Sequence, residues 1–182
     1  MKKQAHRFKN LVGKKLLRLG AMTVLGLSTM SILLPAASYA QEPVVGVANP
    51  DALFTSSDPR LHANKQVAYH IVKDLLEAGH WEQADKYLSK RYIQHNPNAA
   101  SGLDGVIKYF VEVRKVQAKP IPEKMTKPIV AVIAEGDLVT VMYPLPVRDK
   151  TTNQLLYTTT WFDTWRIVDG KADEHWDSAL KN

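Results

Sequence analysis

The sequence contains no cysteine among its 182 residues. This absence excludes disulfide bonds, thiolate metal ligands and a cysteine nucleophile. The chain also lacks internal repeats, low-complexity tracts, a glycine-rich nucleotide-binding loop and a nucleophile elbow. His62 and His70 lie eight residues apart, not at the one-turn spacing of a helical zinc pair. The sequence therefore predicts no metal site.

Acidic residues are absent from the N-terminal part of the chain, where basic residues are concentrated. Residues 1–18 contain seven Lys and Arg, residues 19–34 are uncharged and mostly apolar, and residues 35–40 end in small side chains. This order is typical of a secretory signal peptide, and we expect cleavage after Ala40 and export, most simply to a periplasm. The alternative is an uncleaved anchor, although the apolar run is shorter than the roughly 20 residues that span a bilayer.

The positive net charge belongs to this N-terminal segment. The whole chain has 24 basic and 18 acidic residues, and the seven basic residues of the segment leave 17 basic against 18 acidic ones. The rest of the chain is therefore nearly neutral, which predicts no nucleic-acid partner. We also expect no stable membrane insertion once the segment is removed.

The remaining residues fit one domain with a single core. Residues 41–57 have two prolines and no hydrophobic period, so they are predicted to be a linker or a loose N-terminal arm. Residues 58–182 form the predicted domain, and Asp58-Pro59 is typical of a helix start. Apolar spacing then predicts three helices, over about residues 59–78, 81–90 and 101–115.

From about residue 120 the apolar residues alternate, as they do in strands. The alternation predicts strands over residues 129–134, 138–147, 155–168 and 171–180, and Pro144 and Pro146 place the far part of the second strand at an edge or a bulge. Helices followed by hairpin-linked strands indicate an α+β fold, with the helices covering one face of a curved, mostly antiparallel sheet.

The last two predicted strands form a hairpin around Asp169-Gly170, a typical two-residue turn. If Val168 pairs with Lys171, regular alternation places Asp163 opposite Trp176. The more apolar face then carries Asp163, Trp165, Ile167, Ala172, Glu174 and Trp176. A carboxylate on such a face needs a reason, because burying a charge is costly. Asp163 either takes part in catalysis or ligand binding, or it caps the strand edge or pairs with an arginine.

Several segments resemble one known family. They are YIQHNP at residues 92–97, the glycine-containing stretch 102–110, DTWR at 163–166, and DGK followed by EHWD at 169–177. Over about residues 65–180 the chain resembles the SnoaL-like proteins, which belong to the superfamily of nuclear transport factor 2 and ketosteroid isomerase. The resemblance implies a cone-shaped fold that encloses a pocket, activity without a cofactor, and frequent homodimers.

The resemblance also implies roles for particular residues. SnoaL-like polyketide cyclases catalyse an aldol condensation with an Asp acid/base, which Asp163 matches. Met142 stands where many relatives have a pocket histidine. His95 and Asn96, after the second predicted helix, are expected at the opposite wall, where they would steady a developing oxyanion or simply bind loop backbone.

The tryptophans and the remaining polar residues of the hairpin have assignments as well. Trp165 and Trp176 are expected to be core residues that also wall the pocket. Glu174 is assigned to the pocket or its rim, and His175, on the other face, is expected to be structural.

Two functions remain open. The first is a cofactor-independent lyase or isomerase that acts on a small hydrophobic carbonyl compound with Asp163 and His95 as catalytic residues. The second is a periplasmic module that binds a small hydrophobic ligand without converting it. In either case, the moderately polar faces of the strand around residues 157–164 favour a homodimer through the outer face of the sheet.

Overall fold

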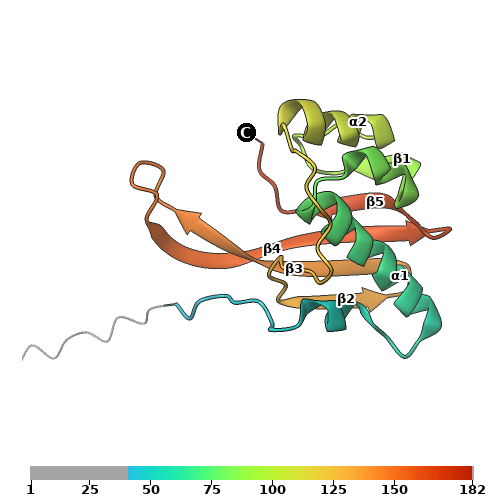
Figure 1. The fold of residues 1–182 in the computed structure, drawn as a ribbon, viewed down its shortest axis with the longest axis horizontal. Helices are drawn as coiled ribbons and strands as arrows, with labels where there is room; N and C mark the ends of the chain where they lie inside the picture. Colours follow the sequence, from blue (N-terminus) through green and yellow to red (C-terminus); the bar gives the residue numbers. More distant parts are fainter. Residues whose placement is uncertain (1–40, 182) are drawn as a thin grey trace, which may run out of the picture. The chain divides into compact units, whose positions relative to one another are not determined.

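A computed structural model describes residues 41–181 of the chain. The predicted signal peptide, residues 1–40, lies outside the described residues. In the described part, the helices and the first strand precede the rest of a five-stranded sheet of order β1-β5-β4-β3-β2 (Figure 1). β1 runs parallel to β5, and every other neighbouring pair is antiparallel. The predicted α+β class is therefore confirmed. None of the helices in residues 41–181 is long and apolar enough to cross a membrane.

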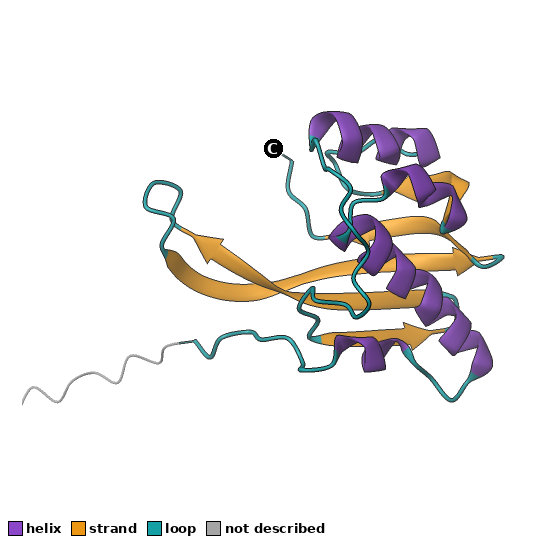
Figure 2. Ribbon diagram, in the orientation of Figure 1, coloured by secondary structure: helices purple, strands orange, loops and turns teal. Residues whose placement is uncertain are grey.

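The first helix begins where the sequence predicts. The Asp58 carboxylate accepts hydrogen bonds from the backbone N–H groups of Arg60 and Leu61, at 2.8 and 3.0 Å, and so caps α1 (Pro59–His70). The helix continues into a π-helical segment, Ile71–Glu77, whose buried side chains enter the core. Helix α1 crosses the inner face of the sheet, where it contacts four strands (Figure 2).

The second predicted helix is wrong in its second half. A 3-10 helix spans Trp81–Lys86, and β1 (Leu88–Gln94) follows it as an edge strand of the sheet. A run of ten residues is too short for its hydrophobic period to distinguish a helix from a strand, and Tyr92 and Ile93, just beyond it, favour a strand. His95 and Asn96 therefore follow a strand rather than a helix.

The third predicted helix is present at the side of β1. It consists of α2 (Leu103–Lys108) and a π-helical continuation, Tyr109–Val113. Val106 is its buried anchor, and α2 packs against both β1 and the 3-10 helix that precedes it.

Residues 41–57, predicted to be a linker or a loose arm, contact the domain at several points. The Val47 N–H donates to the Ile129 carbonyl at 2.8 Å, and a 3-10 helix, Pro50–Phe54, buries Phe54 completely. The core lies between the helices and the inner face of the sheet. Its largest fully buried side chains include Trp165, Phe54, Leu75, Leu88 and Ile129.

The four later strands lie close to their predicted positions. They are β2 (Ala131–Glu135), β3 (Leu138–Arg148), β4 (Leu155–Val168) and β5 (Lys171–Asp177). β3 and β4 extend together beyond the other strands as a long hairpin (Figure 1). Pro144 and Pro146 lie beyond the last pair of β3 with β2, so they occupy an edge, as predicted.

The register of the β4–β5 hairpin differs from the regular one. Asp169 and Gly170 have φ values of 50° and 74°, as the predicted turn requires, and Val168 pairs with Lys171. Ile167 then pairs with Ala172, but Arg166 pairs with Glu174, which leaves Asp173 as an extra residue. Because of this β-bulge, every later residue of β5 lies on the face of the sheet opposite to the one that regular pairing predicts.

The bulge is held by polar contacts with β1. The Ser89 hydroxyl donates to Asp173 at 2.7 Å, and the Arg91 guanidinium forms an ion pair with the same carboxylate. Arg91 and, to a smaller extent, Ser89 hold the pKa of Asp173 below its usual range. The buried carboxylate of the bulge is therefore paired and stays ionised.

Candidate functional site

A pocket of about 460 Å³ lies between the helices and the inner face of the sheet. Aromatic side chains supply much of its wall, among them Trp81, Tyr92, Tyr109, Phe110, Tyr143, Trp161 and Trp165. Trp81 and Phe110 stack face to face, with ring centroids 3.7 Å apart. Polar side chains gather on one part of this wall, namely Gln94, Asn96, Asp163, His175 and Asp177. Asn98, Arg114 and Lys127 line the pocket as well. The pocket therefore combines apolar walls with a few polar side chains, which is the usual composition of a small-molecule site.

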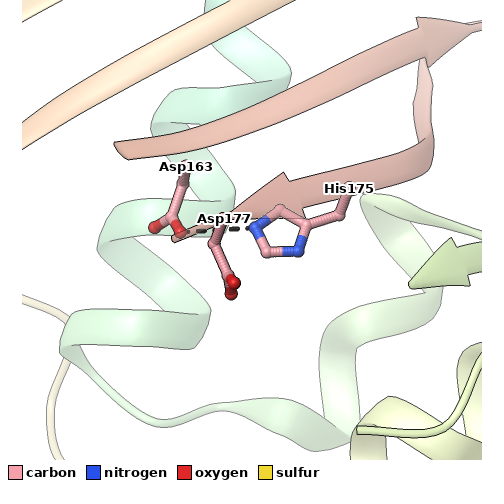
Figure 3. Close-up of side chains that lie close together, drawn as sticks. All are labelled: Asp163, His175 and Asp177. Atoms are coloured by element: carbon pink, nitrogen blue, oxygen red, sulfur yellow. Dashed lines mark hydrogen bonds and ion pairs between the residues drawn. The ribbon is translucent and has the colours of Figure 1, made fainter. Parts of the chain in front are cut away.

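Asp163, His175 and Asp177 form the centre of the polar cluster (Figure 3). Asp163 pairs across the strands with Asp177, and His175 pairs with Trp165, so the three side chains project from neighbouring positions of β4 and β5. One donor atom of each lies within 4.8 Å of those of the other two. Asp163 and His175 are only 8% and 6% exposed, so their charges are largely shielded from bulk water.

The hydrogen bonds of Gln94 determine which imidazole nitrogen of His175 carries a proton. The Gln94 side-chain oxygen accepts a hydrogen bond from the backbone N–H of Asn96 at 3.0 Å, which identifies that atom as the oxygen of the amide. The same oxygen lies 2.7 Å from Nδ1 of His175. Nδ1 must therefore be the donor, and the neutral imidazole has its lone pair on Nε2.

Nε2 of His175 faces a carboxylate oxygen. It lies 3.3 Å from Oδ1 of Asp163, which also accepts the indole N–H of Trp161 at 2.8 Å. Two acceptor atoms at this separation repel each other unless a proton or another cation lies between them. Asp163 and His175 are therefore a coupled pair, to which we refer as the Asp163–His175 dyad.

Two buried tyrosines lie beside the dyad. The Tyr143 hydroxyl makes no hydrogen bond of ordinary geometry within residues 41–181, although burial and the nearby Asp163 charge raise its pKa well above the usual value. The Tyr92 hydroxyl accepts the indole N–H of Trp165 at 3.1 Å, and burial raises its pKa as well. Both hydroxyls therefore remain protonated near neutral pH, and Tyr143 can donate to a ligand.

Asp177 is held from two sides. The Asn96 side-chain amide donates to its Oδ2 atom at 2.6 Å, and the backbone N–H of Ala179 donates to Oδ1 at 2.9 Å. Asn96 thus orients a pocket carboxylate.

The structure brings three of the predicted site residues together. Asp163, Asn96 and Trp165 all line the pocket, and Trp165 is also a core residue that is only 1% exposed. The predicted contact between Asp163 and Trp176 is wrong, because the bulge at Asp173 places Asp177 opposite Asp163.

Four other predicted site residues lie on the outer face of the sheet or its edge, not in the pocket. The His95 ring stacks on Trp176, with centroids 5.1 Å apart, and its Nε2 atom lies 2.8 Å from Glu174. His95 and Arg166 lower the pKa of Glu174. Met142 pairs with Phe162 and alternates with the inward-facing Val141 and Tyr143. The bulge explains the placement of Glu174 and Trp176, and simple alternation along β3 explains that of Met142.

Sequence reasoning missed the residues that complete the cluster, namely Gln94, Tyr143, His175 and Asp177. His175 and Asp177 were assigned to the other face because regular pairing was assumed through the bulge. The adjacent acids Asp173 and Glu174 are the feature of the sequence that indicates the bulge. In a regular strand one of two successive residues faces the core, whereas a bulge can leave both next to polar partners. Gln94 was missed because its segment was not recognised as reaching the sheet.

The fold and the pocket define a class, that of α+β domains in which helices cover one face of a mostly antiparallel sheet. The model of the SnoaL-like domain matches residues 70–175, which is more than half of the sequence. The chain therefore belongs to the SnoaL-like family. Among curated proteins, no significant match to this sequence was found.

Solved structures with a similar arrangement have low sequence identity to this chain. A protein from Acidithiobacillus ferrooxidans, provisionally named a polyketide cyclase, is 16% identical and has a TM-score of 0.47, with 68% of this chain and 89% of that chain covered. A similarly named protein from Bacillus cereus is 17% identical, with a TM-score of 0.46 and coverage of 77% and 87%. A protein of unknown function with a cystatin-like fold from Xanthomonas campestris is 17% identical, with a TM-score of 0.45 and coverage of 63% and 88%.

Proposed function

We propose that this protein is a lyase or isomerase that moves a proton of a small hydrophobic carbonyl compound with the Asp163–His175 dyad. The supporting observation is the 3.3 Å approach of Nε2 of His175 to Oδ1 of Asp163 in the wall of an aromatic pocket. The catalytic histidine of this proposal is His175 rather than His95, which lies outside the pocket and binds Glu174.

Asp163 has an oxygen available for proton transfer. Its Oδ1 atom receives the Trp161 indole N–H and faces His175, whereas its Oδ2 atom has no hydrogen bond of ordinary geometry in the part of the chain that the structure describes. With one proton held between Oδ1 and Nε2, Oδ2 can accept a second proton from a carbon acid. The shared proton then stays on Nε2, so that Asp163 becomes a neutral carboxylic acid and His175 carries the positive charge that balances the enolate, and Gln94 fixes the imidazole ring.

The Tyr143 hydroxyl supplies a donor for the carbonyl oxygen. When the α C–H bond breaks, its electron pair forms a C=C bond and the carbonyl oxygen gains negative charge. A buried donor that is already in position stabilises this charge more than water does. The resulting enol either regains a proton at another carbon, which is isomerisation, or attacks a second carbonyl carbon, which is an aldol condensation.

The pocket walls favour a flat, largely apolar ligand. Trp81 and Phe110 present a stacked aromatic pair, and Trp161 and Trp165 add two indoles on the strand side. A volume of about 460 Å³ suits a ligand of one to three fused rings. The dyad and Tyr143 then contact the one polar part of such a ligand.

A deuterium-exchange experiment tests this proposal. Aromatic ketones and β-keto esters that raise the melting temperature of the EDTA-treated protein are incubated with it in D₂O, and loss of their α-proton signals is followed by NMR. Asp163→Asn should slow exchange by at least about 100-fold while the ligand still binds. His95→Gln serves as the matched control, because it removes a histidine–carboxylate pair outside the pocket, and it should leave exchange unchanged.

The same experiment distinguishes catalysis from binding alone. Ligands that stabilise the wild-type protein but exchange no α-proton would indicate the binding module instead. Exchange that survives Asp163→Asn would contradict the role assigned to the dyad.

A further inference from the structure

We propose that Asp163, His175 and Asp177 also bind one divalent transition-metal cation, such as Zn²⁺ or Mn²⁺. Their donor atoms lie within 4.8 Å of one another on facing strands, close enough that small side-chain rotations would bring all three to one ion (Figure 3). Carboxylate oxygen and imidazole nitrogen are ligands that these cations bind readily. Sequence spacing gave no sign of this cluster, because its members come together only through the bulge.

The charge of the cluster favours a cation. Neither Asp163 nor Asp177 forms an ion pair with a lysine or arginine among residues 41–181; their partners are Trp161, His175, Asn96 and the Ala179 backbone. The other buried carboxylate of this hairpin, Asp173, does have an arginine partner. Arg114 and Lys127 line the same pocket but form no ion pair with either carboxylate. Two carboxylates on one pocket wall that have no Lys or Arg ion pair are stabilised by a bound cation.

Each of the three donors is oriented by a neighbouring group. Gln94 accepts the Nδ1 proton of His175, which directs the lone pair of Nε2 toward the cluster. Asn96 holds Asp177 and Trp161 holds Asp163, at 2.6 and 2.8 Å. Metal-binding histidines typically donate their other N–H to an oxygen in this manner, and metal-binding carboxylates are typically hydrogen-bonded.

A fourth group indicates where a further ligand would lie. The Tyr143 side chain is 5% exposed and lines the same pocket, and its hydroxyl makes no hydrogen bond of ordinary geometry within the described residues, although the Asp163 carboxylate lies near it. Three protein ligands leave at least one coordination position of such a cation for water or a carbonyl oxygen. A molecule in that position, on the pocket side, would provide the Tyr143 hydroxyl with an acceptor.

The binding of a cation would interfere with proton transfer. A cation held by Nε2 of His175 and the Asp163 carboxylate occupies lone pairs that the dyad needs as a base. The cation-bound form should therefore exchange no α-proton. The binding claim is independent of the proposed function, whereas this effect on activity rests on it.

Calorimetric titration of the EDTA-stripped full chain with ZnCl₂ or MnCl₂ tests the inference. We expect one cation per chain, and we expect His175→Ala and Asp177→Asn each to weaken binding by at least about tenfold. His95→Gln is the control, since its removal of the exposed His95–Glu174 pair should leave the affinity unchanged. If a variant does not fold, NMR of the wild-type imidazole decides the question: addition of Zn²⁺ should shift Nε2 of His175 while Nδ1 keeps its proton.

The outcomes separate the two proposals. No cation uptake, or uptake that His175→Ala and Asp177→Asn leave unchanged, overturns the metal site and leaves the proposed function intact. If the EDTA-treated wild-type protein exchanges no α-proton, the proposed function is overturned, and the result on cation binding is unaffected. Exchange that continues with the cation bound at this site overturns the predicted interference.

Discussion

Gln94→Leu removes the group that sets the protonation pattern of the Asp163–His175 dyad. The Gln94 oxygen accepts two hydrogen bonds, from Nδ1 of His175 at 2.7 Å and from the Asn96 N–H at 3.0 Å. His175 is 6% exposed, so its orphaned N–H should cost about 1–3 kcal/mol. The half-buried Asn96 N–H can bind water instead, so the loss of its hydrogen bond to Gln94 should cost about 1 kcal/mol. We therefore expect a loss of about 2–4 kcal/mol in the free energy of unfolding, measured with urea.

Activity should fall through a separate effect. Without the acceptor at Nδ1, the proton of the neutral imidazole can move to Nε2, which then no longer accepts a proton in the dyad. We expect α-proton exchange to slow by about 10- to 100-fold, as is usual when the partner of a functional histidine is lost. Imidazole nitrogen shifts should show the tautomer with the proton on Nε2, which a purely structural role of Gln94 would not produce.

Gln94→Glu is the matched control, because it keeps an acceptor oxygen on a side chain of the same length. It should retain the proton on Nδ1 and most of the exchange activity. If the Leu and Glu variants lose equal activity, or if the tautomer of the Leu variant is unchanged, the positioning role of Gln94 is wrong.

Three other predictions concern the bulge, the assembly and the N-terminus. Because Arg91 lowers the pKa of Asp173 below 3.8, the pair should stabilise the fold above about pH 4 and lose this effect as the pH falls through the folded-state pKa. Urea titrations of Asp173→Asn should thus show a weaker loss of stability on acidification than the wild type, and equal pH dependence would count against the pairing. We propose a homodimer through the outer face of the sheet, where Phe162 is 41% exposed. Phe162→Asp should convert this dimer to a monomer of about 16 kDa in a sedimentation experiment. A wild-type protein that is monomeric at tens of micromolar would refute the dimer. We predict that the exported protein begins at Gln41, which N-terminal sequencing from the native host would verify, whereas an intact Met1 would exclude cleavage.

The parts of the fold that local chemistry determines were predictable from the sequence. The Asp58 cap, the Asp169-Gly170 turn and the edge position of Pro144 all follow from the preferences of one or two residues. The strands of the long hairpin were predictable as well, because buried residues alternate along β3 and along the second half of β4, which is rich in aromatic and β-branched residues.

The composition of the site was less predictable because it depends on register. One extra residue at Asp173 exchanges the faces of Glu174 and His175, and its side chain binds Ser89 and Arg91, about 80 positions earlier in the chain. Local alternation contains no information about such a distant partner. Asp163 lies before the bulge in its own strand, so its inward orientation was predicted correctly.

The central claim, that Asp163 and His175 act as one unit, is tested most directly by a double-mutant cycle on the rate of α-proton exchange. The rates of Asp163→Asn, His175→Gln and the double variant are compared with that of the EDTA-treated wild type. If the two side chains share one proton-transfer function, the double variant should be no slower than the slower single variant. Losses that multiply in the double variant would show that the two residues act independently, and would contradict this account.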